Sequence, residues 1–261
     1  MNKQHVFNQQ DWTIIPLTLA EQQEHIERSE LLLASATPGS SPVLYWSQAT
    51  REGLVLGFSQ KESVLNLQAV ASAHLPVYHR RAGGTAVLVG PHLLGLDVLL
   101  PADHPLVLTD IVESYRWFGE TWVQALCLLG IDTRLVTPDE AHMQRALARQ
   151  EELKARETVL RRACYASNSS YEVVVGERKL VGLDMLRRRH GSLLQAGILL
   201  SWQSETLATV LGHTPDEQRL LREQLPARAV GLDELAVRAI STQEIIQAFE
   251  TVLFKKSKMG V

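Results

Sequence analysis

Three β-rich runs follow one another between residues 171 and 202, with no helical pattern between them. They cover residues 171–175, 179–187 and 193–202, and only a short turn around Gly176-Glu177-Arg178 separates the first two. A connection of this length joins antiparallel strands, whereas parallel neighbours need a crossover of about a dozen residues or more. The chain is therefore expected to contain an antiparallel hairpin, and not a strictly alternating, all-parallel α/β sheet.

The remaining patterns come in blocks of strands and blocks of helices. Helical patterns are expected at 18–34, 66–74, 106–130, 204–212, 215–224 and 241–254, and 138–157 is expected to be helical in part. Further strands are expected at 42–48, 53–57, 76–81, 86–89, 93–100 and 133–137. Blocks of this kind favour an α+β fold, in which mixed or antiparallel sheets are flanked by helices.

Composition limits the class of protein. The 261 residues are 45% hydrophobic and 21% charged, and we expect one domain covering residues 1–261. The net charge of −3 supplies no basic field for nucleic acid, and no apolar stretch is long enough to cross a membrane. The first eleven residues are polar and lack the apolar core of a secretion signal, and two cysteines are too few for a disulfide framework. These features indicate a cytoplasmic protein.

A glycine-bearing loop lies between two expected strands and reads Arg80-Arg81-Ala82-Gly83-Gly84-Thr85-Ala86. Adjacent glycines let the backbone approach a ligand closely, and two arginines supply bidentate donors for a carboxylate or phosphate. A plain hairpin turn with exposed arginines explains the spacing equally well. The common nucleotide-binding loops, G-x-G-x-x-G after a strand and G-x-x-x-x-G-K-[ST], do not occur. The histidines show no metal-ligand spacing, so no metal site is predicted.

Two further residues could carry chemistry. Cys164 follows Arg161 and Arg162, and neighbouring cations favour the reactive thiolate. An inert buried cysteine is the commoner case, and Cys127, inside the helical pattern 106–130, is expected to lie in the core. Lys179 begins a β-rich run and could point inward to hold a carbonyl or phosphate oxygen, although a lysine beside a turn is usually solvated.

Together these segments resemble the lipoate–protein ligase and octanoyltransferase family, whose members are relatives of biotin–protein ligases. Members carry an R-R-x-G-G-G-x-V type loop, then a K-x-x-G strand, then an L-x-x-G-(S/I)-L-L strand. The corresponding segments here are 80–87, 179–182 and 194–200. The resemblance also includes the strand at 12–16 and the segment 54–60, and it covers the chain to about residue 202. It implies an α+β catalytic domain of the biotin/lipoate protein ligase type.

Within this family, Ala163-Cys164-Tyr165-Ala166 ahead of Tyr171-Glu172-Val173 looks most like the octanoyltransferase branch that uses a cysteine nucleophile. The resemblance implies that Cys164 takes an octanoyl or lipoyl group as a thioester and that Lys179 steadies the acyl carbonyl. The group would then pass to a lysine of a lipoyl carrier domain, with no cofactor and no metal. The substrate-binding residues implied in the same way are Arg80, Arg81, Gly83, Gly84, Thr85, Ala86, Gly182 and Gly197.

The sequence also departs from the family pattern. Thr85 replaces the third glycine of the loop, residues 88–91 lack the usual His-Asp pair, and Ala196 replaces a histidine. Two alternatives therefore stay open: an ATP-dependent lipoate–protein ligase, which would use ATP and Mg²⁺, and a non-catalytic lipoyl-binding member of the family.

The resemblance also implies partners. An acyl carrier protein would donate the octanoyl group, and a lipoyl domain or a glycine cleavage H-type protein would accept it. The arginines at 187–189 either form a solvated hairpin tip or dock such an acidic carrier.

Overall fold

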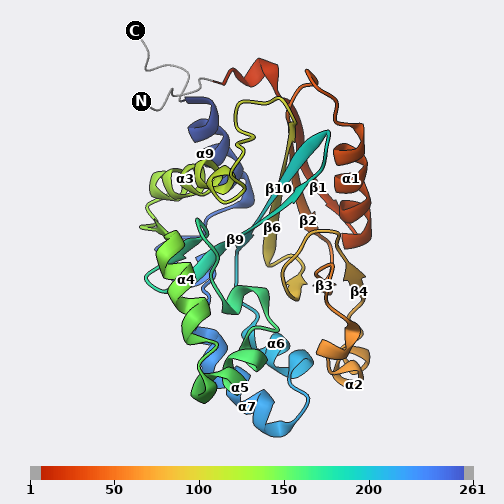
Figure 1. Cartoon of the computed structure of the whole chain (residues 1–261), viewed down its shortest axis with the longest axis vertical. Helices are drawn as coiled ribbons and strands as arrows, with labels where there is room; N and C mark the ends of the chain where they lie inside the picture. The colour runs from red at the N-terminus through yellow and green to blue at the C-terminus, as the bar shows by residue number, and fades with distance from the viewer. Residues whose placement is uncertain (1–6, 256–261) are drawn as a thin grey trace.

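The computed structural model of the chain describes residues 7–255 (Figure 1). Residues 1–6, within the polar segment where no secretion signal is expected, and residues 256–261 lie outside this range. The strands are β1 (Thr13–Ala20), β2 (Val43–Ala49), β3 (Gly53–Leu56), β4 (Val77–His79), β5 (Val87–Val89), β6 (Leu93–Pro101), β7 (Arg134–Leu135), β8 (Val173–Val175), β9 (Arg178–Arg187) and β10 (Gly191–Leu199). The helices are α1 (Gln22–Ser35), α2 (Leu67–Ser72), α3 (Glu113–Leu128), α4 (Pro138–Leu147), α5 (Glu151–Leu160), α6 (Ser204–Leu211), α7 (Pro215–Gln224), α8 (Leu232–Leu235) and α9 (Thr242–Lys255). Within the described range, no helix is both long and apolar enough to cross a membrane.

The strands form two mixed sheets. The larger has the order β1-β2-β6-β10-β9-β8-β7, and the smaller has the order β4-β3-β5. β1 pairs parallel with β2, and β3 pairs parallel with β4, while the other neighbours are antiparallel. The α+β class predicted from the sequence is confirmed. The predicted hairpin is also confirmed, because β8 and β9 meet at a turn in which Gly176 has a φ of +57°.

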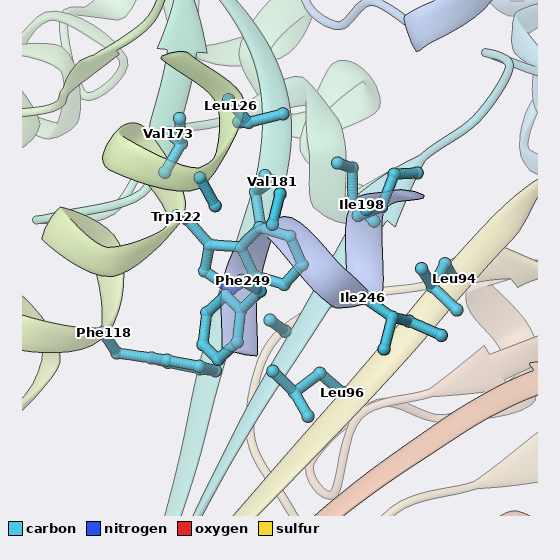
Figure 2. Close-up of a cluster of buried hydrophobic side chains, with 14 of the residues drawn as sticks. Leu94, Leu96, Phe118, Trp122, Leu126, Val173, Val181, Ile198, Ile246 and Phe249 are labelled. Atoms are coloured by element: carbon cyan, nitrogen blue, oxygen red, sulfur yellow. The ribbon is translucent and has the colours of Figure 1, made fainter. Parts of the chain in front are cut away.

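The side chains of β6 alternate between the two faces of the larger sheet, as the pleat of a strand requires. Leu94 and Leu96 point to the face covered by α3 and α9. There they belong to the same buried cluster as Trp122 and Phe249, whose ring centroids are 4.6 Å apart (Figure 2). This apolar cluster is the main core of the molecule.

The opposite face of the larger sheet is covered by α1 near one edge and by the smaller sheet further along (Figure 1). Leu33 of α1 packs there against Leu99 and Leu193. Between α1 and the smaller sheet, β6 presents Gly95 and Asp97 instead of large apolar side chains. Side chains therefore do not fill the space beside this face of the sheet, and a pocket remains there.

A second apolar cluster joins the smaller sheet to the helices at the lower end of the molecule in Figure 1. Leu54 and Leu56 of β3 pack in it with Leu211 of α6 and with Leu160, the last residue of α5. Ala163 is also buried in this cluster. The residue directly before Cys164 is therefore anchored in the core that the smaller sheet shares with these helices.

Two predicted helices begin later than expected. Residues 18–20 continue β1 and pair with residues 47–49 of β2, so the helix predicted at 18–34 starts at Gln22. Sheet pairing prevails there over the helical spacing of apolar residues. The helix predicted at 106–130 covers only Glu113–Leu128. Its start is fixed by Asp110, whose Oδ1 accepts hydrogen bonds from the backbone N–H groups of Val112 and Glu113.

The expectation for Cys127 is wrong. The side of α3 that faces the core carries Phe118, Trp122 and Leu126, whereas Cys127 is exposed. An apolar neighbourhood in the sequence suggested burial, but the position one residue after Leu126 is rotated by about 100° around the helix axis.

Candidate active site around Cys164

Backbone hydrogen bonds tie Cys164 to the glycine-bearing loop. Cys164 opens a short 3-10 turn, Cys164–Ala166, that follows α5. Its N–H donates to the carbonyl of Ala86 at 2.9 Å, and the N–H of Ala86 donates to the carbonyl of Arg162 at 3.0 Å. Ala86 and Ala163 thus form an isolated parallel bridge. Two segments that the sequence singled out separately are brought together in space.

Lys179 points inward, as the family resemblance implies and unlike the usual lysine beside a turn, and is almost completely buried at 1% exposure. Its Nζ lies 2.7 Å from Oε2 of Glu172 and donates to the backbone carbonyl of Cys164 at 3.1 Å. An ammonium carries three protons, and these two contacts use two of them. The ammonium also lies over the ring of Tyr165, 5.5 Å from its centroid. The ammonium therefore contacts the backbone of Cys164, and the carboxylate of Glu172 balances its charge.

Glu172 is a site residue that the motif analysis did not single out. It is 2% exposed, and its two carboxylate oxygens accept backbone hydrogen bonds from Ser169 at 2.6 Å and from Leu183 at 3.2 Å. These bonds compensate a buried carboxylate that would otherwise be costly. An acidic residue directly before the apolar run of β8 is the sequence signal that could have identified it.

Cys164 lies where two pockets meet. The first pocket encloses about 880 Å³, part of it open to solvent, and lies between the larger sheet, the smaller sheet and α1. Its walls include Ile26, Val55, Val87 and Val89. The second pocket is more polar and is lined by Lys179, Glu172, Arg145 of α4 and the serines at 167, 169 and 170, among others. The two pockets share Arg80, Cys164, Leu183 and Asp184.

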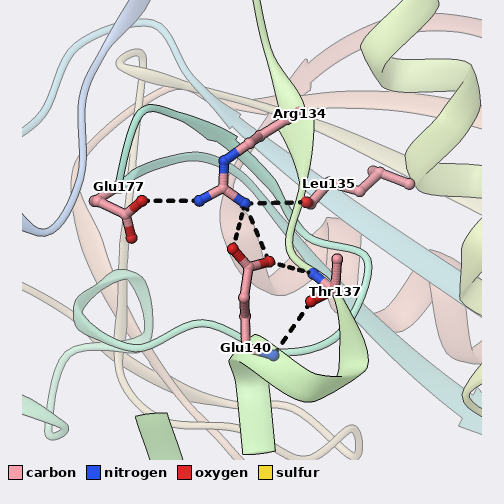
Figure 3. A network of polar contacts seen from close by, with 5 residues as sticks. All are labelled: Arg134, Leu135, Thr137, Glu140 and Glu177. Carbon is pink, nitrogen blue, oxygen red and sulfur yellow. Dashed lines mark hydrogen bonds and ion pairs between the residues drawn. The ribbon is translucent and has the colours of Figure 1, made fainter. Parts of the chain in front are cut away.

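A network of polar contacts fixes α4, which contributes Arg145 to the second pocket. Figure 3 shows Arg134 of β7 bonded to Glu140 at 2.9 Å and 3.1 Å and to Glu177 of the β8–β9 turn at 2.8 Å. Glu140 in turn accepts from the backbone N–H of Thr137, which completes a capping box at the start of α4. Arg134 thereby links the start of α4 to the turn that precedes Lys179.

Hydrogen bonds from Arg80 fix the conformation of the glycine-bearing loop. Its guanidinium donates to the carbonyls of Gly83 at 3.0 Å and Thr85 at 3.2 Å, and its Nε lies 3.3 Å from Oδ2 of Asp184. Burial raises the pKa of Asp184, and the charge of Arg80 opposes that shift. Gly84 has a φ of +85°, so a residue with a side chain would be strained there.

Three glycines form part of the floor of the first pocket. Gly95, Gly197 and Gly182 lie directly opposite one another on β6, β10 and β9. A Cβ atom on Gly197 would lie 2.6 Å from the hydroxyl of Tyr165, which donates to the carbonyl of Gly197 at 2.6 Å. Burial raises the pKa of Tyr165 well above its usual value, so the hydroxyl stays protonated. The absence of side chains on this row lets Tyr165 lie on the sheet beside Cys164.

The structure does not bring all the predicted residues into the pockets. Arg80, Gly84, Thr85, Gly182 and Gly197 line one pocket or both. Gly83 and Ala86 lie in the loop but do not line either pocket, and Ala86 instead positions Cys164. Arg81 is exposed, and its Nε lies 2.9 Å from Oε1 of Glu30 on α1.

The two arginines before Cys164 are engaged elsewhere. Arg162 forms a bidentate pair with Glu217 of α7, at 2.6 Å and 2.9 Å. Arg161 donates to the carbonyl of Gln144, and its Nε lies 3.7 Å from Oε2 of Glu157. The expectation that these arginines act on the thiol is therefore not supported by the geometry, and a cation that does contact Cys164, at its backbone carbonyl, is Lys179.

Comparisons with known proteins agree with this architecture. Residues 22–254 match the family model described as the lipoyl protein ligase A/B catalytic domain. An octanoyltransferase LipM from Brevibacillus brevis is 32% identical over 209 residues, which cover 78% of this chain and 70% of the relative. An octanoyltransferase LipM from Kyrpidia tusciae is 33% identical over 198 residues, which cover 75% of this chain and 68% of the relative.

Solved structures of the same fold are also similar. A bipartite lipoate protein ligase from Thermoplasma acidophilum, described with its E2 lipoyl domain, superposes with a TM-score of 0.73 at 18% identity, over 97% of this chain and 84% of that chain. A lipoate-protein ligase A bound with ATP superposes with a TM-score of 0.70 at 17% identity, over 94% and 84%. At these identities the structures show the fold alone. The family model and the relatives above 30% identity place this chain in the family of lipoyl protein ligase A/B catalytic domains.

Proposed function

We propose that this protein is an octanoyltransferase that carries the acyl group on Cys164 and delivers it to a lysine of a lipoyl carrier domain. The observation that supports this most strongly is the position of Cys164 where two pockets meet, the second more polar than the first, with the buried ammonium of Lys179 against its backbone. Such a position lets the acyl chain occupy one pocket while a carrier group enters or leaves by the other. Relatives named octanoyltransferase LipM support the same reaction class.

In the first step, the thiolate of Cys164 attacks the carbonyl carbon of an octanoyl thioester on a carrier. The bond between the carbonyl carbon and Sγ forms, and the carrier leaves as a thiolate that takes up a proton. Negative charge develops on the carbonyl oxygen in the transition state, and a fixed donor aimed at that oxygen lowers the barrier. Lys179 supplies this donor through its remaining N–H, because its other two contacts hold it in place.

In the second step, the neutral amine of the acceptor lysine attacks the thioester. The amide bond forms, the bond to Sγ breaks, and the proton lost by the amine restores the thiol of Cys164 or enters solvent. No group is oxidised or reduced, and the energy of the thioester drives the transfer, so this reaction calls for no cofactor.

The partners follow from this chemistry. The donor would be an acyl carrier protein bearing an octanoyl thioester, and the acceptor a lipoyl domain or an H-type protein of glycine cleavage. The two cysteines are unpaired, which suits a reducing compartment such as the cytoplasm.

A second candidate is an ATP-dependent lipoate–protein ligase, favoured by the fold shared with the ATP-bound ligase. The two functions differ in a direct measurement. The transferase is expected to show no octanoate- or lipoate-dependent exchange between ATP and pyrophosphate, whereas a ligase would show it with Mg²⁺ present. A third candidate, a lipoyl-binding protein without turnover, would show neither exchange nor transfer.

The decisive experiment is intact-mass measurement after mixing the protein with octanoyl carrier protein. We expect a single octanoyl adduct that hydroxylamine removes and that disappears when a lipoyl domain is added. Cys164→Ser should form no octanoyl adduct, because a serine hydroxyl without a neighbouring base is too poor a nucleophile to form the corresponding ester. Transfer at the wild-type rate by Cys164→Ser would overturn the covalent mechanism.

A further inference from the structure

Asp184 of β9 lines both pockets, as Cys164 does. Alternate residues of a strand point to the same face, so the side chain of Asp184 leaves β9 on the same face as Gly182, about 7 Å further along the strand. Tyr165, the residue after Cys164, covers this face at Gly182, where a Cβ atom would lie 3.2 Å from Cζ of the tyrosine ring. The carboxylate of Asp184 is therefore the next side chain on this face after the turn that carries the thiol.

The two steps of the proposed transfer differ in their need for a base. In the first step a thiolate attacks and a thiolate leaves, so no proton has to move while the bonds change. In the second step an amine becomes an amide, and its nitrogen is positively charged once it is bonded to the carbonyl carbon. That nitrogen must lose a proton, and a base within hydrogen-bond reach accelerates the loss.

The other bases that line the pockets are engaged or line only one of them. His25 lines the first pocket, and its ring nitrogens are hydrogen-bonded to a tyrosine hydroxyl at 2.6 Å and to a backbone carbonyl at 3.2 Å. Glu172 is 2% exposed, and its oxygens are occupied by Lys179 and by two backbone N–H groups. Asp97 lines the first pocket but not the second.

Asp184 keeps the capacity to accept a proton. Its Oδ1 accepts a hydrogen bond from the backbone N–H of Met185 at 2.8 Å, which uses one of about four lone-pair sites on the carboxylate. Its Oδ2 lies 3.3 Å from Nε of Arg80, but that N–H donates to the carbonyl of Gly83. Oδ2 accepts no hydrogen bond from the residues that the structure describes. The side chain is 27% exposed, so the carboxylate is open to the pockets.

The surroundings of Asp184 suit a base. Burial raises the pKa of its carboxyl group, and the charge of Glu172 acts in the same direction. The charge of Arg80 and the hydrogen bond from Met185 oppose this shift and stabilise the carboxylate, the form that can accept a proton. A carboxylate with a raised pKa is a stronger base than an exposed aspartate.

We propose that Asp184 is the general base of the second step, in which its carboxylate hydrogen-bonds the attacking amine of the acceptor lysine and takes the proton that the nitrogen loses. The inference rests on the proposed transfer through Cys164 and adds a catalytic residue to its second half. The C–N bond forms, the proton passes from nitrogen to Asp184, and the bond from the carbonyl carbon to Sγ breaks. The thiolate that leaves takes up this proton from Asp184, or the proton passes to solvent, and the carboxylate is restored.

The test measures the two half-reactions separately. The protein is loaded from octanoyl carrier protein, freed of the donor and mixed with a lipoyl domain, while intact mass follows the octanoyl adduct. Asp184→Asn keeps the size of the side chain but removes the base. Loss of the adduct to the lipoyl domain should therefore slow by about 10²–10⁴-fold, the contribution of a general base. Loading should stay close to the wild-type rate, because the first step moves no proton.

A second nucleophile distinguishes a base from a structural role. Hydroxylamine is largely neutral near neutral pH, and its nitrogen, once bonded to the carbonyl carbon, gives up a proton to water more readily than an alkylamine does. Removal of the octanoyl group by hydroxylamine should therefore differ little between the wild type and Asp184→Asn. Displacement of the glycine-bearing loop, which Arg80 connects to Asp184, would instead slow loading and both nucleophiles.

Two more variants complete the test. Asp184→Ser also lacks the carboxylate and should show the same selective loss, so the result does not depend on the folding of one protein. The matched control is Asp139→Asn on α4, which makes the same change in charge at an exposed position outside both pockets. This control should leave both half-reactions at the wild-type rates.

Wild-type loss of the adduct to the lipoyl domain in either Asp184 variant would overturn the inference and leave the proposed transferase intact. Equal slowing of loading and of both nucleophiles would also overturn it, because Asp184 would then act only on the shape of the site. If the wild-type protein forms no octanoyl adduct, the proposed function fails, and the inference fails with it.

Discussion

The Nζ atom of Lys179 lies 2.7 Å from Oε2 of Glu172, and both side chains are at most 3% exposed. A buried pair of this kind depends on both partners, because removing one leaves an uncompensated charge. Removing Lys179 has two effects: the oxyanion loses its donor, and Glu172 is left as a buried carboxylate without a cation. A test of Lys179 in catalysis must therefore separate them. Truncating the lysine alone changes both.

A double-mutant cycle separates them. Glu172→Leu and Lys179→Met should each lower the free energy of unfolding by about 3–5 kcal/mol, because each leaves the other charge buried and unpaired. The double variant should recover the part of this loss that comes from the unpaired charge, although the N–H groups of Ser169 and Leu183 still lose their acceptor. Its rate of acyl transfer should nevertheless stay about 10²–10³-fold below wild type, the cost of losing one oxyanion donor. Denaturant unfolding and single-turnover transfer measure the two quantities, and recovery of the rate in the double variant would exclude Lys179 as the donor.

The exposed position of Cys127 gives a second prediction. Cys127→Ser should leave the rate of transfer unchanged and alter the free energy of unfolding by no more than about 0.5 kcal/mol, as for an ordinary surface substitution. A core cysteine would instead incur the cost of a buried hydroxyl. Because an exposed thiol also reacts with alkylating reagents, mass measurements of the Cys164 adduct are cleanest in the Cys127→Ser protein. Loss of the octanoyl adduct in that protein would move the acyl site to Cys127.

Gly57 and Gly83 test how tightly the glycine-bearing loop is packed, because a side chain would be crowded at the first position and unhindered at the second. A Cβ atom on Gly57 would lie 2.1 Å from the carbonyl oxygen of Gly84, whereas a Cβ atom on Gly83 would meet nothing within 4 Å. Gly57→Ala should therefore displace the loop, lower stability by about 1–3 kcal/mol and slow transfer. Gly83→Ala should be close to neutral in both. Thermal melting and kcat/KM test the pair, and a severe effect of Gly83→Ala alone would point to a direct role for that position in binding.

The sequence contains enough information for the local parts of this site. The β8–β9 turn and the glycine-bearing loop each depend on residues that are close together in the chain. The motif order also placed Cys164 and Lys179 in one site, although only through resemblance to a family.

The long-range parts were not predictable in the same way. Ser29 and Asp97 are hydrogen-bonded although 68 positions separate them, and their meeting depends on how α1 packs on β6. Arg161 and Arg162 were expected near the thiol because they precede it, yet Arg162 reaches Glu217, 55 positions away. Proximity in sequence does not fix the direction of a long side chain, since partners from distant elements compete for it.

The β9–β10 hairpin provides a prediction about partner docking. Arg188 and Arg189 are exposed between the two strands, whereas Arg187 donates to the carbonyl of Leu108 and to Ser114. Reversing Arg188 and Arg189 to Glu should slow loading from an acidic carrier protein and flatten its salt dependence, as expected for steering charges. Arg187 is excluded because its loss would also disturb the start of α3.

Charge reversal of Arg219 and Arg222 on α7 is the control, because their ion pairs are on the surface and contribute little to stability. Stopped-flow loading rates between low and physiological salt compare the two double variants. If both variants slow loading equally, the effect comes from net charge and not from the hairpin.

Burial raises the pKa of Asp97 to about 6, against the hydrogen bonds from Ser29 and Gln195, which lower it. The folded protein therefore keeps this proton at pH values where the unfolded chain, with an ordinary value of 3.8, has lost it. Stability from this group is fully present below about pH 4 and falls as the pH rises toward 6, by about 3 kcal/mol at 1.36 kcal/mol per pH unit.

Asp97→Asn has no such proton, so the free energy of unfolding of the wild type relative to this variant should fall by that amount between about pH 3.5 and 7. Denaturant unfolding of both proteins across this range measures the difference, with the exposed Asp139→Asn as the control for the change in net charge. A difference that does not vary with pH would mean that the folded protein does not hold the Asp97 proton more tightly than the unfolded chain does.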